Sequence, residues 1–171
     1  IQRPMPLWLG AWAPAAVRRA ARMGDGWMIG PSMSLDELRP LADLYREECE
    51  KAGTTPQLIL MRDGWVASSR AEAERVYGPE VLTAYQYYWR NGALAFKGMA
   101  SQSEFTLENL ARDRIILGEP DECVDQLGRW QQALDVDYTL LRLRHAHSGG
   151  PPHAEIRKTI ELFGSAVIPQ L

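Results

Sequence analysis

A short segment near the start of the chain has the residue types and spacing of an anion-binding turn. The apolar run 7–9 predicts a buried strand, Gly10 follows where the chain must turn, and Pro14 suits the first turn of a helix. Backbone N–H groups and the helix dipole point the same way at such a junction, so a phosphate could bind there. The residues of this candidate site are Gly10, Ala11, Trp12, Ala13 and Ala15, together with Gly30 after the next strand. An ordinary strand–helix turn has the same pattern, and the residues alone favour that simpler interpretation.

Two histidines, His145 and His147, follow the last expected strand and share one face because side chains alternate along a strand. They could hold a metal or act as an acid–base group, since an ordinary imidazole titrates near ~6.5. Since no third ligand accompanies them at recognisable spacing, we interpret them as surface loop histidines and predict no metal site. Arg142 and Arg144 have the opposite parity and could reach an anion or simply end the strand.

Three tryptophans could line a cofactor site, and two cysteines are expected in the buried core. Trp12, Trp27 and Trp65 could flank a ring-shaped cofactor, although each is more often a core residue. Cys49 and Cys123 are isolated at apolar helix positions, where cysteine behaves as a small buried hydrophobe. The absence of a disulfide pattern favours a cytoplasmic protein.

The composition is that of a globular domain. Hydrophobic residues make up 46% and charged residues 24% of 171 residues. The net charge of −3 gives no reason to expect nucleic acid or an anionic membrane as a partner. No apolar run approaches the ~18 residues of a membrane span. The chain begins with Ile1 close to a core strand, which we interpret as an internal start.

Strands and helices are expected to alternate along the chain. The predicted strands are 7–9, 27–29, 57–67 and 138–143. Capping boxes at Ser34 and Ser69 are expected to open two of the helices. Pro40 is awkward in the first helix, so its regular part is expected to begin nearer Arg39, and Gly78-Pro79 is expected to break the second. Four strands, each followed by a helix, predict a parallel sheet with right-handed crossovers.

Residues 79–117 stand apart as a helical insertion, in which Thr106 could cap a short helix to Ile116. Such insertions after strands often give barrel enzymes their specificity. We interpret this one as a lid or substrate-side wall, with a peripheral hairpin or an oligomer contact as the alternative.

The ordered set of segments resembles the luciferase-like monooxygenases, which are flavin- or F420-dependent oxidoreductases built on a TIM barrel. The resemblance is carried by the strand ending at Gly10-Ala11, the Ala/Arg helix and Gly24-Asp-Gly-Trp27, then by segments 118–123, 135–142 and 161–169. It implies an α/β fold in which residues 1–171 form one partial domain, the four C-terminal β/α units of a (β/α)8 barrel. The family often has Gly-Gly-Ser-Ser where this chain has Gly-Ala-Trp-Ala at 10–13, so phosphate contacts would come from backbone amides.

The resemblance also implies an activity. It is that of an oxidoreductase or monooxygenase using FMN, or alternatively coenzyme F420, on a small organic substrate with or without oxygen. Half a barrel leaves open strand edges, so we expect a homo-oligomer or association with an absent N-terminal half, and no turnover by the isolated chain. The alternatives are a non-catalytic half-barrel that needs a partner, and a metal-dependent barrel hydrolase using His145 and His147.

Overall fold

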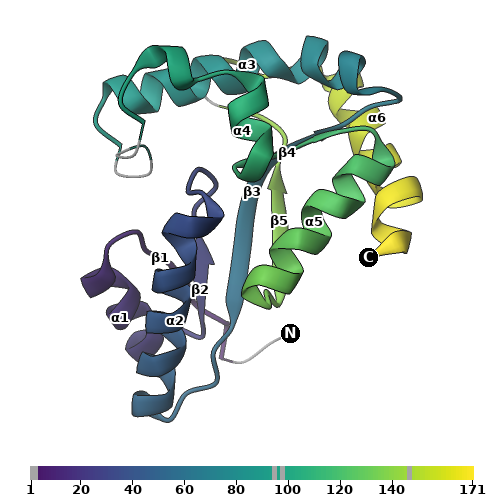
Figure 1. The fold of residues 1–171 in the computed structure, drawn as a ribbon. Helices are drawn as coiled ribbons and strands as arrows, with labels where there is room; N and C mark the ends of the chain where they lie inside the picture. Colours follow the sequence, from purple (N-terminus) through teal and green to yellow (C-terminus); the bar gives the residue numbers. More distant parts are fainter. Residues whose placement is uncertain (1–3, 94–95, 97–98, 146–147) are drawn as a thin grey trace.

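The computed structural model describes residues 4–93, 96, 99–145 and 148–171 of the chain. A parallel five-stranded sheet is flanked by helices (Figure 1). The strands are β1 (Trp8–Gly10), β2 (Gly26–Ile29), β3 (Leu58–Val66), β4 (Ile115–Gly118) and β5 (Tyr138–Arg142). The helices are α1 (Pro14–Met23), α2 (Leu35–Ala52), α3 (Arg70–Arg90), α4 (Leu107–Asp113), α5 (Pro120–Leu134) and α6 (His153–Leu162).

The long strand β3 organises the sheet. Its first residues pair with β2 and, from Ile59 to Asp63, with β5. Its last residues, Asp63 to Val66, pair with β4. The expected count of four strands was therefore wrong, because β4 had been interpreted as the end of the helix that Thr106 caps. Its apolar residues follow α4 directly and are fully buried, so the sequence has no turn residue to separate them.

Two helices differ from prediction at proline. The α2 helix begins at Leu35, not near Arg39, because Ser34 and Glu37 form a complete capping box and the helix continues through Pro40. The α3 helix likewise continues through Pro79 and does not break there. A Cβ on the neighbouring Gly78 would lie 2.6 Å from Leu107, so α3 and α4 touch at this position. Packing of the buried α3 side chains offsets the hydrogen bond that proline removes.

The sheet has two unlike faces. On the face we call the covered face, the side chains of Trp27, Ile29, Leu58 and Leu60 pack in one cluster against α1, α2 and α5. Alternation and strand register place Trp8, Met28, Met61, Tyr138 and Leu140 on the opposite face, which we call the open face. A second cluster joins α3, α4 and β4 above the carboxyl ends of the strands. No helix in the described part of the chain is long and apolar enough to cross a membrane.

Candidate functional site

A cleft of about 340 Å³ opens at the carboxyl ends of the strands. Trp12 follows β1, Pro31 and Ser32 follow β2, and Arg142 ends β5. Tyr88 of α3 lines the side contributed by the insertion, with Ala93 and Phe96 just beyond that helix. The insertion therefore supplies one wall of the cleft, at the end of the sheet where parallel α/β folds bind their ligands.

Trp12 is one wall of the cleft and lies directly against Gly30. A Cβ built on Gly30 would lie 1.9 Å from the indole ring of Trp12, so only glycine leaves room for the ring in this position. Trp27 is a core residue instead: it is fully buried and donates its indole N–H to the carbonyl oxygen of Ala11 at 3.1 Å. Trp65 is also buried, stacked on Tyr77 with ring centroids 5.2 Å apart. Of the three tryptophans considered from sequence, Trp12 alone lines this cleft among the described residues.

A buried carboxylate lies behind Arg142. Asp63 on β3 and Arg142 on β5 are register partners, and the guanidinium donates to both carboxylate oxygens, Nε to Oδ1 at 2.6 Å and Nη2 to Oδ2 at 2.9 Å. Tyr85 of α3 donates its hydroxyl to Oδ2 at 2.6 Å. Burial, reinforced by the Asp63 charge, raises the pKa of Tyr85 well above its ordinary value, so the phenol stays protonated. Burial lowers the pKa of Arg142, but the bonds to Asp63 outweigh it and the net pKa is raised.

His145 belongs to the same polar group. It is buried, not on the surface as predicted, because its ring lies against Tyr77 and Tyr85 of α3, with ring centroids 5.9 and 6.2 Å apart. Its Nε2 lies 3.1 Å from the hydroxyl of Tyr77 and 3.6 Å from Oδ1 of Asp63. His147 lies outside the described residues. Within the residues that the structure describes, no group of three or more His, Cys, Asp or Glu side chains could hold a metal ion.

A second buried arginine fixes the loop between β2 and α2. Arg62 donates Nη1 to the carbonyl of Gly30 at 2.9 Å and Nη2 to that of Met33 at 3.2 Å, and its guanidinium lies 3.8 Å over the ring of Trp130. Burial lowers its pKa to about 10. Arg114, just before β4, donates to the carbonyl of Ser32. The loop that carries Pro31 and Ser32 into the cleft is therefore held from both sides.

The predicted anion-binding turn is present as backbone geometry. The α1 helix begins at Pro14 without a side-chain cap at Ala13 and without an acidic residue in its first turn. Within the described part of the chain, the N–H groups of Trp12, Ala13 and Ala15 donate to no other residue. A Cβ at Gly10 would meet open space. The donor set therefore fits a phosphate, which would take the place that a capping side chain fills elsewhere.

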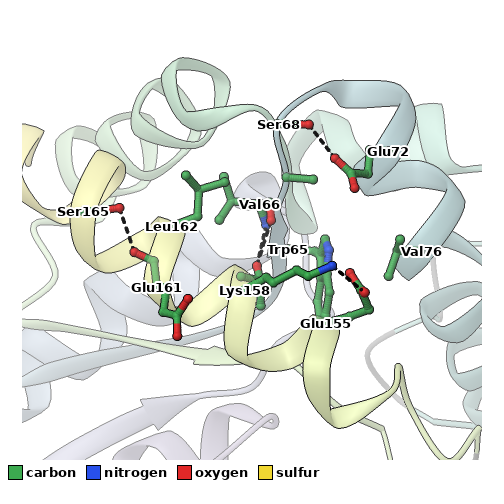
Figure 2. A pocket seen from close by; sticks show the side chains of 12 residues that line it. Trp65, Val66, Ser68, Glu72, Val76, Glu155, Lys158, Glu161, Leu162 and Ser165 are labelled. Carbon is green, nitrogen blue, oxygen red and sulfur yellow. Dashed lines mark hydrogen bonds and ion pairs between the residues drawn. The ribbon is translucent and has the colours of Figure 1, made fainter.

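A larger hollow of about 420 Å³ lies elsewhere, between the start of α3, the end of β3 and α6. Figure 2 shows that polar groups lining it bond to one another: Lys158 reaches Glu155 at 2.9 Å, and the Ser68 hydroxyl donates to Glu72 at 2.5 Å. Thr159 both donates to and accepts from the backbone of Val66. The Thr159 bonds thus hold α6 to the end of β3, whereas the other two contacts are local, one within α6 and one at the start of α3.

Comparison with known proteins agrees with this geometry. A family model described as luciferase-like monooxygenase matches residues 1–136. An F420-dependent glucose-6-phosphate dehydrogenase of Microbacterium testaceum is 24% identical over 99% of this chain and 49% of its own length. The crystal structure of monooxygenase RslO1 from Streptomyces bottropensis superposes with a TM-score of 0.74 at 25% identity, over 98% of this chain and 49% of that one. The FMN complex of the oxygenating constituent of 3,6-diketocamphane monooxygenase from Pseudomonas putida has the same fold, with a TM-score of 0.72 at 20% identity, over 96% of this chain and 48% of that one.

These matches confirm the predicted fold class, a parallel α/β arrangement of the TIM-barrel type. The chain spans about half the length of the curated relatives it matches. Since the family model covers most of the chain, this protein belongs to the luciferase-like monooxygenase family.

Proposed function

We propose that this chain forms the C-terminal half of an oxidoreductase that uses coenzyme F420. The observation that carries the proposal is the cleft at the carboxyl ends of β1, β2 and β5, walled by Trp12 and by the insertion. The curated relatives from Microbacterium testaceum and Amycolatopsis mediterranei carry F420 in their names, which favours it over FMN. An FMN-dependent monooxygenase is the second candidate, favoured by the match to the FMN complex of the 3,6-diketocamphane monooxygenase component. The bound cofactor would supply the redox chemistry, and the protein would hold and shield it.

The cofactor phosphate is assigned to the turn at residues 10–15. The free N–H groups of Trp12, Ala13 and Ala15 and the positive end of the α1 dipole support this site. Gly10 leaves the space beside the turn open, and Gly30 leaves room for the ring of Trp12. The backbone of Ala11 is held in place by Trp27. A hydroxyl-free turn can bind a phosphate through these amides alone.

The open face supports a partner half. Trp8, Tyr138 and Leu140 are 36%, 52% and 41% exposed, although they are large apolar side chains on strands. An apolar sheet face of this kind marks an association surface. The occupant proposed here is an N-terminal barrel half, with a second copy of this chain as the alternative. A cytoplasmic location, expected from the two buried free cysteines, stays a prediction.

Fluorescence anisotropy of F420 and of FMN, titrated with the 171-residue chain, tests the cofactor. We expect F420 to bind more tightly than FMN, and Gly10→Val to weaken binding without loss of the folded circular dichroism signal, because valine has room but blocks the amides. Gly128→Val is the matched control, since its Cβ also meets open space but lies on α5, away from the turn. Equal binding by Gly10→Val would place the phosphate elsewhere.

Light scattering and binding of an apolar dye test the open face. We expect the chain to associate with itself, or to bind the dye as a monomer. A stable monomer that binds no dye would contradict the proposed partner surface.

A further inference from the structure

We propose that the substrate in this cleft is a small apolar acid, and that Arg142 is the residue that anchors its carboxylate. The inference rests on the proposed function, because it names the substrate class of the same site. It departs from the substrate that the curated relatives' names carry, glucose 6-phosphate.

Arg142 presents a fixed and partly free hydrogen-bonding edge. A guanidinium has five N–H donors in a rigid fork. The edge made by Nε and Nη2 is taken by Asp63, at 2.6 and 2.9 Å. Within the described part of the chain, Nη1 donates to no residue, and the side chain is 29% exposed where it lines the cleft. The edge made by Nη1 and the second N–H of Nη2 therefore remains for a ligand, and it matches the two oxygens of a carboxylate.

Asp63 makes this edge rigid. Its carboxylate is fully buried, accepts the hydroxyl of Tyr85 at 2.6 Å, and is register-paired with Arg142 across β3 and β5. A guanidinium held at one edge by a buried carboxylate has few alternative rotamers, so little conformational entropy is lost when the other edge binds an anion. Asp63 and Tyr85 are positioning residues in this arrangement, whereas Arg142 touches the ligand.

The residues that line the cleft indicate the chemistry of the rest of the ligand. Trp12, Pro31, Ala93 and Phe96 offer apolar surface, and the polar side chains among the described lining residues are those of Ser32, Tyr88 and Arg142. A sugar phosphate would leave several hydroxyl groups buried without partners, and each unpaired hydroxyl is costly. A ring or short chain with one carboxylate satisfies the walls and the arginine together. The volume of about 340 Å³ is at the small end for ligand sites, which suits a small acid.

Calorimetric titration of the full chain with three probes tests the ligand class. We expect 2-naphthoate to bind at least about tenfold more tightly than 2-naphthamide, because the amide cannot accept two charged hydrogen bonds. Glucose 6-phosphate should bind no more tightly than inorganic phosphate. Tighter binding of glucose 6-phosphate than of 2-naphthoate would overturn the proposal.

Two variants test the anchor. Arg142→Lys keeps the charge but not the fork, so 2-naphthoate affinity should fall at least about tenfold. Because a lone change could leave Asp63 buried and unpaired, the double variant Asp63→Asn with Arg142→Gln removes both charges, and it should retain its thermal unfolding transition while losing the preference for naphthoate over naphthamide. Arg144→Gln is the matched control: Arg144 is exposed, donates to Gly149 and lies outside the cleft lining. Unchanged naphthoate affinity in a folded Arg142 variant would overturn the proposal.

Cofactor binding to the same variants separates this inference from the proposed function. If F420 binds and 2-naphthoate does not, the acid anchor is wrong and the cofactor assignment stands. If 2-naphthoate binds through Arg142 but neither F420 nor FMN binds, the cofactor assignment is wrong and the anchor stands. If F420 displaces 2-naphthoate competitively, Arg142 serves the cofactor and the substrate assignment is overturned.

Discussion

Alternate side chains of the same strands meet two different environments in this sheet. On the covered face, Trp27 and Leu60 are fully buried against α1, α2 and α5. On the open face, Trp8 of β1 and Tyr138 of β5 have ring centroids 5.4 Å apart. Both side chains remain substantially exposed. Both faces are apolar, so hydrophobicity alone does not distinguish them.

The open face itself changes character along the strands. Its amino-terminal part carries the aromatic and aliphatic side chains, and its carboxyl end carries Asp63 and Arg142. A buried ion pair is weak evidence for stability, because its desolvation cost can exceed its attraction. A surface that is apolar at one end and charged at the other suits a binding face better than a second core. The following changes would break or sharpen this comparison.

The largest effect is expected at the charged end of the open face. Asp63→Ala leaves Arg142 without its partner and Tyr85 without its acceptor, which should lower the free energy of unfolding by about 3–5 kcal/mol. Asp43→Ala is the control, because Asp43 is exposed and its contact with Arg46 is 3.9 Å, and it should change stability by less than ~0.5 kcal/mol. Urea unfolding measures both. A cost below ~1 kcal/mol for Asp63→Ala would mean that the pair contributes little.

Paired leucine truncations compare the two faces directly. Leu60→Ala opens a cavity in the covered core and should cost about 2–5 kcal/mol. Leu140→Ala removes a side chain that is already 41% exposed and should cost less than ~1 kcal/mol in a dilute sample. If the open face associates, the cost of Leu140→Ala should rise with protein concentration, whereas that of Leu60→Ala should not. Equal costs at all concentrations would show that the two faces are equally buried.

Local signals in the sequence were enough for much of the fold. The capping residues Ser34 and Ser69 both accept the predicted hydrogen bond from the third helical residue. Gly53 ends α2 in a left-handed conformation, which glycine adopts without strain. The errors arose where tertiary contacts outweigh local preference: β4 is recognisable only by its pairing with β3, and α3 passes Pro79 because its buried face packs against neighbouring elements.

The candidate site was less accessible from sequence. Trp12 was considered as a cofactor wall and lines the cleft, and Arg142 was considered as an anion contact, but Asp63 was missed. The two residues are 79 positions apart, so their pairing depends on the register of β3 with β5. A usable signal was present: Arg62 and Asp63 interrupt an apolar strand, and charges within a buried strand need partners.

The contact between Gly30 and Trp12 gives a smaller effect. Gly30→Val places a side chain where the indole lies and should cost about 1–3 kcal/mol while displacing Trp12 from the cleft. Adding Trp12→Ala should recover part of that loss, because the ring that clashes is gone. Thermal unfolding of the two single variants and the double variant measures the coupling. Strictly additive effects would show that the two residues do not meet.

The smallest effect per step concerns alkaline pH, and it tests how completely the covered core is buried. Burial raises the pKa of Tyr45, in the covered core, to about 12, and raises that of Tyr85 well above its ordinary value. A folded-state pKa above the unfolded value means that stability is complete below about pH 10 and is lost as the pH rises, by at most ~1.4 kcal/mol per pH unit for each tyrosine. Arg62 acts in the opposite direction, because its lowered folded pKa of about 10 makes stability rise with pH above that value.

Urea unfolding between pH 9 and about pH 12 measures the net effect of these groups on the free energy of unfolding. The tyrosines outnumber the arginine, so their effect should dominate. We expect stability to fall with pH in the parent chain, and Tyr45→Phe to make the fall shallower by up to ~1.4 kcal/mol per pH unit between about pH 10 and 12. An identical slope in Tyr45→Phe would show that burial in the covered core does not hold the proton on Tyr45 at high pH.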